Sequence, residues 1–286
     1  MEIKSVCKIK NLKKEYKGFT LRVDELEIPM GYTTVIVGEN GAGKTTLLKR
    51  VAGICLDQEE KITYFDGEKI GQVKNRIGYT GTKNYYFPHW TIEQIKTLSE
   101  EMFDDFDGKK FDYYCSQWNI GNNDRKKPVV TFSDGNYTQL TLAGAFSRNC
   151  DFLVLDEPSS PLDPLMRDTL NDEIRDYIDK GNGYKSILLS THNIKDMDNV
   201  CDYVILMHDG YIVEKGFSED LKDKYLIVQG EKEDFHKAKD YLLMCRQNQF
   251  AFEGMALSEH RDRLLDLDLS RPDLSTILVN LMKAER

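Results

Sequence analysis

The sequence has no long apolar run. None of its 286 residues lies in a stretch that approaches the roughly 18 apolar residues a membrane-spanning helix needs. Residues 1–8 also lack the apolar core of a secretory signal peptide. We therefore expect a cytoplasmic protein, and any role at a membrane would go through a partner.

The sequence also lacks an excess of basic residues. Lys and Arg number 39 against 48 Asp and Glu, so the formal net charge is −9. Proteins that bind nucleic acid in a general way hold its phosphates with basic surfaces. We therefore expect no nucleic acid among the partners of this protein.

Closely spaced cysteine pairs are missing as well. The chain has six cysteines, and none forms a C-x-x-C pair. Such scattered spacing is not typical of a metal site or of a disulfide framework. We expect reduced thiols, most of them in the core, at Cys7, Cys55, Cys115, Cys150, Cys201 and Cys245.

What the sequence does contain is a glycine-rich stretch between an apolar run and an apolar helical pattern. Residues 38–45 read Gly-Glu-Asn-Gly-Ala-Gly-Lys-Thr and fit the P-loop pattern G-x-x-x-x-G-K-[ST]. Glycines let the backbone curl with its N–H groups around phosphate oxygens, and a helix that begins at Lys44 directs its positive end there. A turn that only joins a strand to a helix would not need all of these features together. We predict nucleotide contacts at Gly38, Asn40, Gly41, Ala42, Gly43, Lys44, Thr45 and Thr46.

Apolar periodicity predicts an α/β fold around this stretch. Residues 3–28 alternate as an antiparallel hairpin with its turn at Lys17-Gly18, and short strands follow near residues 62–65 and 77–79. Further on, unbroken apolar runs predict buried strands with helices between them. The alternation predicts a P-loop NTPase core, a mostly parallel sheet with helices on both faces, beside an antiparallel β subdomain. The later strands are expected at 152–155, 186–189, 203–207 and 211–214, and the main helices at 44–53, 164–180 and 193–200.

A helical subdomain is expected at residues 91–148. There the apolar period approaches 3.6, with helical patterns over residues 91–105 and 109–118. A third helix is expected to begin at Ser133, a residue type that caps helix N-termini. This subdomain stands between the two halves of the predicted parallel sheet.

The pattern weakens after about residue 224. A strand is expected at residues 226–228, and helices at residues 234–245 and 273–283. We therefore divide the chain into a domain of residues 1–225 and a small C-terminal α+β extension of residues 226–286.

Further candidate residues lie at the ends of predicted strands. Asp156 and Glu157 follow the run of residues 152–155, and two adjacent acids after a buried strand are typical of a Walker B motif. His192 follows the strand of residues 186–189, and that place favours a site over an ordinary polar cap. Tyr16 precedes the hairpin turn, where its ring either stacks on a base or packs half-buried in the strand.

Taken together, residues 3–225 resemble the ATP-binding subunit of an ABC transporter, and the tail resembles those of ABC-2-type exporter subunits. The helical insert ends in residues 132–136, Phe-Ser-Asp-Gly-Asn, where that family carries its LSGGQ signature. The resemblance implies that Ser133 and Gly135 contact the γ-phosphate held by a second ATPase subunit, and that Asp163 reaches toward that subunit.

The same resemblance implies roles at the P-loop. ATP and Mg²⁺ are the implied ligands, with Lys44 at the β- and γ-phosphates and with Thr45 and Asp156 holding the metal. Glu157 polarises the attacking water, and His192 bonds the γ-phosphate.

Two departures from the family pattern stand out. Asp134 replaces a glycine of the signature, and an acid 4 Å from a phosphate charge costs about 4 kcal/mol at an effective dielectric of about 20. We therefore expect Asp134 to point outward to solvent. Thr82 replaces the family's glutamine, which contacts Mg²⁺. The aromatic stretch of residues 83–90 beside it suits either a protein partner or core packing.

We interpret the chain as an ATPase that works in a dimer, a homodimer or a heterodimer, and drives a separate integral-membrane permease, with a weak preference for export. It would then be peripheral on the inner face of the membrane. A soluble regulatory ATPase that dimerises with ATP and has no permease is the alternative from another class. A P-loop kinase or GTPase is disfavoured, because those proteins lack a helical insert ending in a Ser-x-Gly cap before an Asp-Glu strand end.

Restoring the missing glutamine tests the assignment of residue 82. If a water fills the gap left by the shorter side chain, Thr82→Gln should tighten Mg²⁺-ATP binding or raise turnover modestly. Titration calorimetry and a steady-state ATPase assay measure the two. No change in either would show that this segment is misaligned with the family.

Overall fold

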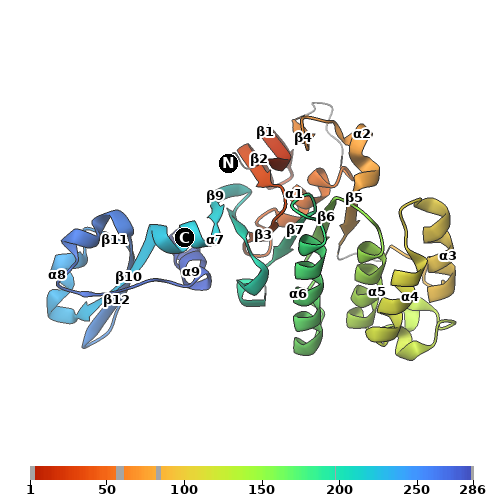
Figure 1. The fold of residues 1–286 in the computed structure, drawn as a ribbon. Helices are drawn as coiled ribbons and strands as arrows, with labels where there is room; N and C mark the ends of the chain where they lie inside the picture. The colour runs from red at the N-terminus through yellow and green to blue at the C-terminus, as the bar shows by residue number, and fades with distance from the viewer. Residues whose placement is uncertain (1–3, 56–60, 82–84, 197, 285–286) are drawn as a thin grey trace.

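The computed structural model describes residues 4–284 except 56–60, 82–84 and 197, so Thr82 lies outside the described residues. A six-stranded sheet with strand order β5-β6-β7-β3-β8-β9 forms the centre (Figure 1). Its neighbouring strands are parallel except for the antiparallel pair β8 and β9. The fold class expected from the sequence is thus confirmed. The strands are β3 (Thr33–Val37), β5 (Ile77–Thr80), β6 (Phe152–Asp156), β7 (Ser186–Thr191), β8 (Tyr203–His208) and β9 (Tyr211–Phe217).

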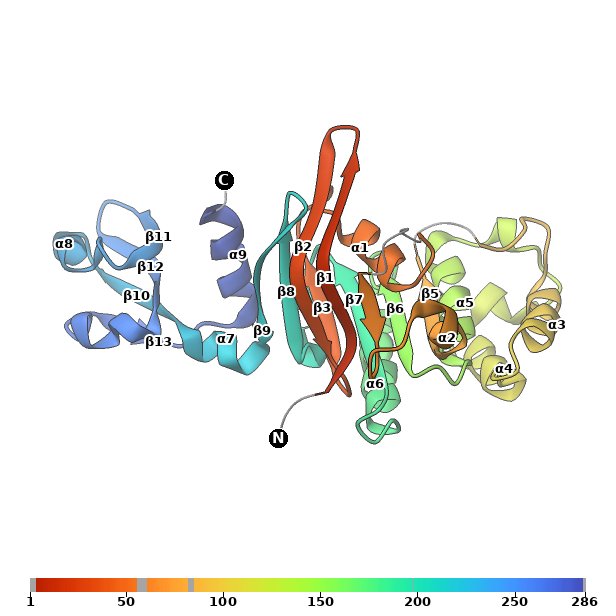
Figure 2. The ribbon, with the colours of Figure 1, turned by 90° about the horizontal axis from the view of Figure 1, so that it is seen from above.

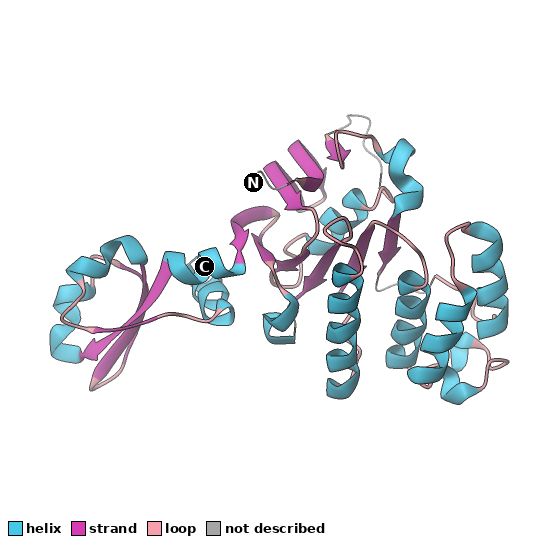
Figure 3. Ribbon diagram, in the orientation of Figure 1, coloured by secondary structure: helices cyan, strands magenta, loops and turns pink. Residues whose placement is uncertain are grey.

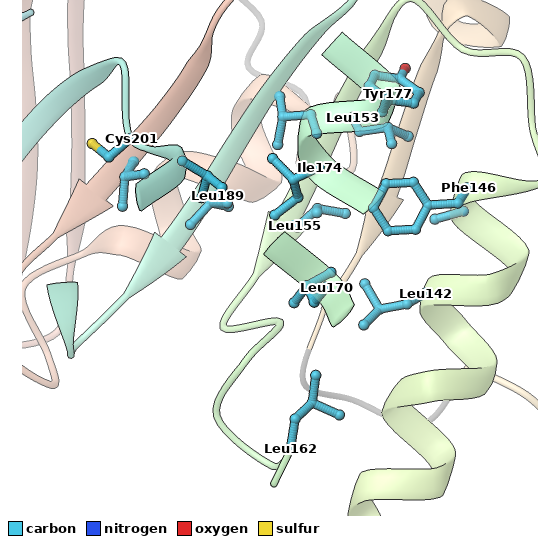
Figure 4. Packing of buried hydrophobic residues seen from close by; sticks show 14 of the residues in the cluster. Leu142, Phe146, Leu153, Leu155, Leu162, Leu170, Ile174, Tyr177, Leu189 and Cys201 are labelled. Atoms are coloured by element: carbon cyan, nitrogen blue, oxygen red, sulfur yellow. The ribbon is translucent and has the colours of Figure 1, made fainter. Parts of the chain in front are cut away.

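Both faces of this sheet are buried, because alternate strand residues enter two different cores. Leu153 and Leu155 of β6 pack with α5 (Asp134–Phe146) and α6 (Pro164–Asp179), as Figure 4 shows. Val154, which lies between them, points to the opposite core, which includes α1 (Lys44–Val51). Burial on both sides explains the unbroken apolar runs in the sequence.

A three-stranded antiparallel sheet, β2-β1-β4, covers the α1 side. Its strands are β1 (Ser5–Tyr16), β2 (Phe19–Pro29) and β4 (Ile62–Tyr64). The hairpin closes with Tyr16 opposite Phe19, and Gly18 takes a φ of +81° in the turn, where an L side chain would be strained. The hairpin predicted at residues 3–28 is confirmed. The short helices α2 (Ile70–Val73) and η1 (Lys74–Arg76) follow β4.

Short helices fill residues 92–146 at one end of the molecule (Figure 1). Side-chain oxygens cap their first turns: Thr91 caps α3, Asp107 caps α4 and Ser133 caps α5. The Tyr114 hydroxyl donates to Glu173 of α6 at 2.8 Å and so ties this part to the core. The elements here are α3 (Ile92–Met102), α4 (Gly108–Gln117), η2 (Ile120–Asn123) and η3 (Val129–Thr131).

A second antiparallel sheet, with strand order β11-β12-β10-β13, forms at the opposite end of the molecule (Figure 2). One of its faces packs on α8 and η7, and α9 lies between the sheet and β9. The elements are α7 (Ser218–Lys224), β10 (Tyr225–Glu231), η6 (Lys232–Asp234), α8 (Phe235–Ala238), β11 (Leu242–Gln247), β12 (Ala251–Leu257), η7 (Ser258–Arg263), β13 (Asp268–Ser270) and α9 (Leu274–Ala284).

Two expected helices are wrong. The helix of residues 234–245 ends at Ala238, because residues 242–247 pair with β12 and that long-range ladder overrides the local helical pattern. Instead of a helix at 193–200, the structure has the short 3-10 turns η4 (Ile194–Asp196) and η5 (Asp198–Val200). Ile194 and Val200, one in each turn, are both buried in the same core.

The six cysteines are free thiols, and four of them are buried. Burial raises the pKa of Cys115 to about 11 and that of Cys150 to about 12, so both stay protonated at neutral pH. The expectation that most of these residues lie in the core is confirmed. None of the helices in the described ranges combines the length and apolarity of a membrane span.

A core substitution tests the packing between α4, α5 and α6. Phe146 is 1% exposed, with Tyr114 and Tyr177 ring centroids 6.3 and 6.0 Å from its own. Phe146→Ala should lower the free energy of unfolding by about 3–5 kcal/mol, because it leaves a cavity among these rings. Leu165→Ala, at a position that is 78% exposed, should change it by less than about 0.5 kcal/mol. Equilibrium urea unfolding measures both, and equal losses would contradict this packing.

Candidate nucleotide-binding site

The loop between β3 and α1 depends on its glycines. Gly41 and Gly43 take φ values of +91° and +101°, which L side chains rarely adopt. A Cβ on Gly38 would lie 2.4 Å from the backbone oxygen of Met207, so this position also excludes a side chain. The loop therefore brings its backbone close to β8 and leads directly into α1, whose positive end faces the space above the sheet.

Lys44 begins α1 and is held inside this loop. Its side chain is 6% exposed, and Nζ donates to the backbone oxygens of Gly38 at 2.8 Å and Glu39 at 3.2 Å. The same Nζ lies 3.4 Å from Oε1 of Glu157. The loop thus fixes one ammonium group where phosphates would approach.

The Asp156 carboxylate connects three elements at the ends of their strands. Its Oδ1 accepts from Thr45 Oγ1 at 3.0 Å and from Ser190 Oγ at 2.8 Å. Ser190 Oγ in turn accepts from the backbone N–H of Glu157 at 2.9 Å. Sequence reasoning missed Ser190, although its place at the end of the strand before His192 was a usable signal.

The other oxygen of Asp156 fits a cation site. Within the described ranges, Oδ2 is buried and has no hydrogen-bond partner, and it belongs to the carboxylate that also bonds Thr45. An orphaned carboxylate oxygen beside a hydroxyl is a donor set suited to Mg²⁺. Among the residues the structure describes, no group of three or more His, Cys, Asp and Glu could hold a metal alone. Mg²⁺ commonly takes few protein ligands and completes its shell with phosphates and water, so the residues present fit it.

Glu157 joins Lys44 to His192. Its Oε1 lies 3.4 Å from Lys44 Nζ, and its Oε2 lies 2.8 Å from His192 Nδ1. Its backbone has a φ of +51°, which is uncommon outside glycine and often found at functional sites. The carboxylate is 14% exposed while the imidazole is 49% exposed, so the imidazole lies at the mouth of the site.

These groups line one open cleft of about 790 Å³. Most predicted contacts belong to its lining, namely Asn40, Gly41, Ala42, Gly43, Lys44, Thr45, Thr46, Asp156, Glu157 and His192. Asp134 is exposed, as expected, but it belongs to the lining of this cleft. The structure therefore brings the Walker residues together and adds Asp134 at the edge.

Five predicted contacts lie outside this lining: Gly38 within the loop, Tyr16 of the hairpin, and Ser133, Gly135 and Asp163 at the starts of α5 and α6. The last three lie away from the loop. Ser133 accepts from the N–H of Asn136 at 3.2 Å, and Asp163 accepts from the N–H of Met166 at 2.9 Å, so each caps its own helix. A Cβ on Gly135 would lie 3.1 Å from the backbone oxygen of Pro161, which places the first turn of α5 against the loop before α6. The structure does not bring these three residues to the P-loop of the same chain.

Phe19 lies against the P-loop. A Cβ on Gly43 would lie 2.8 Å from Phe19 Cζ, and Phe19 lines the cleft. Tyr16 is 44% exposed, accepts a hydrogen bond from Arg50 at 3.1 Å, and does not line the cleft. The two rings face each other across the hairpin at 6.1 Å between centroids. The sequence feature that could have pointed to Phe19 is its position: it is a second aromatic residue, beside Tyr16, that flanks the hairpin turn.

An aromatic groove of about 290 Å³ lies between β5, α3 and α5. Tyr86 packs against the core, while Tyr85 and Phe87 are 48% and 65% exposed, so the aromatic stretch serves both core and surface. The hydroxyl of Tyr137, on α5, accepts from the N–H groups of Tyr85 and Tyr86 at 2.7 and 3.0 Å. Since Tyr137 also lines the nucleotide cleft, α5 connects the groove to that cleft. The aromatic lining consists of Tyr79, Tyr85, Tyr86, Trp90, Phe103 and Phe106.

Fold and cleft together define a P-loop NTPase with a helical insert ahead of an Asp-Glu strand end. The profile of the ABC transporter family matches residues 21–160. An uncharacterized ABC transporter ATP-binding protein of Methanocaldococcus jannaschii is 31% identical over 79% of this chain and 83% of that protein. The ATP-binding protein TupC of a tungstate uptake system, from Peptoclostridium acidaminophilum, is 30% identical over 72% of this chain and 96% of that protein. The chain belongs to the ABC transporter ATP-binding proteins and is an ATPase of that family, as the sequence predicts.

Solved structures share the fold. An ATP-binding subunit of an ABC transporter has a TM-score of 0.67 at 21% identity, over 76% of this chain and 92% of that one. The dimeric ATP-binding cassette MJ0796, in a post-hydrolysis state with ADP and Pi, has a TM-score of 0.64 at 18% identity, over 74% of this chain and 98% of that one.

Ser190, near the end of β7, allows a test with a matched control on the same strand. Ser190→Ala removes a hydroxyl that bonds both Asp156 and Glu157, and a lost hydrogen bond to a charged group should lower turnover about 10- to 100-fold. Ser186 is equally buried on the same strand, but its hydroxyl accepts from Gly31 N, away from the cleft. Ser186→Ala should leave turnover within about twofold. Steady-state ATPase assays compare the two, and equal losses would contradict the role of Ser190.

Proposed function

We propose that this chain hydrolyses ATP in a dimer that binds nucleotide between facing subunits and drives a separate membrane permease. The observation that carries the proposal is the Glu157 carboxylate, held between the Lys44 ammonium and the His192 imidazole beside Asp156. This arrangement places three groups together beside the P-loop: a carboxylate that can act as a base, an ammonium that can bind phosphates and an imidazole that can hydrogen-bond to them.

In the proposed reaction, Lys44 binds the β- and γ-phosphates. Its present acceptors are backbone oxygens of the loop, so the ammonium needs only a small turn toward incoming phosphates. Glu157 orients the attacking water and accepts its proton, and His192 bonds the γ-phosphate and keeps the Glu157 side chain in place.

Asp156 and Thr45 would hold Mg²⁺. The unpartnered Oδ2 of Asp156 and the neighbouring Thr45 hydroxyl are the groups that support this role. When bound, the ion supplies charge neutralisation at the phosphate oxygens. Ser190 keeps the carboxylate in the orientation that leaves Oδ2 free.

A second ATPase subunit would complete the site. Ser133, Gly135 and Asp163 do not line the cleft of their own chain, and Ser133 and Asp163 are exposed. Exposed polar groups at the starts of α5 and α6 are therefore open to a facing subunit, which supports their roles toward its nucleotide. We propose that adenine stacks on Phe19, which lies against Gly43 of the P-loop, and that Tyr16 beside it extends this stacking surface.

The permease is proposed to dock at the aromatic groove. Exposed Tyr85 and Phe87 beside a groove lined by aromatic side chains form a surface typical of a protein contact. Docking there would place the chain on the inner face of a membrane. ATP hydrolysis requires the same cleft residues in an exporter and in an uptake system. The relative TupC belongs to a tungstate uptake system. Co-purification of a polytopic membrane protein would distinguish this proposal from a regulatory ATPase without a permease.

Glu157→Gln tests the catalytic proposal. The variant keeps the shape and loses the charge, so hydrolysis should fall by about 100-fold or more while ATP still binds through Lys44, Thr45 and Asp156. Unhydrolysed ATP should then hold two subunits together, and the variant should elute as a dimer only with Mg²⁺-ATP.

Lys44→Ala provides the contrast. It should lose hydrolysis, bind ATP weakly and stay monomeric, because the fixed cation against the phosphates is gone. Near wild-type turnover in Glu157→Gln would contradict the role of Glu157. An inactive but monomeric Glu157→Gln protein at saturating Mg²⁺-ATP would contradict closure of a homodimer and indicate that the partner is a different subunit.

A further inference from the structure

The C-terminal helix α9 packs against the segment that follows His192. Its buried residues Leu274, Ile277 and Leu278 have the spacing of one helix face. This helix contacts α7, β11 and the turn η4, and Figure 2 shows it between the C-terminal sheet and β9. The extension therefore meets the ATPase core only two residues after the imidazole that bonds Glu157.

Both α9 and η4 contribute buried apolar residues to the same core. Ile194 of η4 is 5% exposed and belongs to the same hydrophobic cluster as Leu274, Ile277 and Leu278. Hydrogen bonds from Thr276 lower the pKa of Asp273, and the positive charge of Lys195 lowers it further. The charge of Lys195 thus acts on the residue that precedes α9, and α9 itself packs on η4.

His192 depends on its backbone for its position. Its ring is about half exposed and hydrogen-bonds to Glu157, so its position also depends on the backbone on either side of it. On the strand side the backbone is held by β7 and by two hydrogen bonds between Thr191 and Asn193. On the other side the first buried anchor is Ile194. A shift of Ile194 would therefore be passed to His192.

We infer that Ile277 is a positioning residue for hydrolysis, acting through Ile194 on His192. The buried face of α9 holds the turn η4, and the turn holds the imidazole at the distance from Glu157 that the reaction needs. This inference rests on the proposed roles of Glu157 and His192. It assigns the C-terminal extension a part in the chemical step, separate from nucleotide binding at the P-loop.

Ile277→Ala in the full-length protein tests this inference. The smaller side chain leaves η4 less firmly held, so kcat should fall about 3- to 10-fold while the dissociation constant for ATP stays within about twofold. Val279→Ala, on the exposed side of the same helix, is the matched control and should keep both values. Ile277→Val removes one methyl group, keeps the fold and should give a smaller fall of kcat in the same direction. Steady-state turnover and calorimetric ATP titration measure the two constants.

The outcomes separate the inference from the proposed function. Unchanged kcat in both Ile277 variants would overturn it. So would equal losses of kcat and ATP affinity, which indicate general destabilisation. If Ile277→Ala does not fold, the kcat of Ile277→Val decides. Wild-type hydrolysis that survives Lys44→Ala would instead contradict the catalytic assignment of the P-loop.

Discussion

The site depends on one carboxylate. Asp156 Oδ1 accepts hydrogen bonds from Thr45 at the start of α1 and from Ser190 at the end of β7, while its own backbone ends β6. Such bonds to a buried charged acceptor are among the stronger ones in proteins. They tie the first turn of α1 to the carboxyl ends of β6 and β7, the edge where open α/β sheets bind ligands.

The second constraint is electrostatic. Lys44 and Glu157 are 6% and 14% exposed and lie 3.4 Å apart, so each charge compensates the other in a region with little water. Removing one partner of such a pair leaves an uncompensated buried charge, which costs about 3–5 kcal/mol. In the proposed reaction, arriving phosphates would replace Glu157 as the partner of Lys44. The Glu157 carboxylate would then face water and His192.

The two ends of the molecule reach the cleft by different routes. From the helical end, α5 contributes Tyr137 to the nucleotide cleft, and the Tyr137 hydroxyl accepts from the N–H groups of Tyr85 and Tyr86, which line the aromatic groove proposed for the permease. From the C-terminal end, α9 packs on the turn after His192. The helical end thus borders the cleft directly, while the C-terminal end is inferred to act on it through η4 and His192.

Local chemistry determined what the sequence alone could predict. The P-loop, the Asp-Glu strand end, the hairpin and the cap at Ser133 depend on neighbouring residues, since glycine conformations, strand burial and helix caps are short-range requirements. Contacts between distant segments decided the rest. The pairing of residues 242–247 with β12 overrode a helical pattern, and two 3-10 turns that bury Ile194 and Val200 replace the helix expected at residues 193–200. Phe19 beside Gly43 and Ser190 on Asp156 likewise become visible only when the fold brings together residues far apart in the chain.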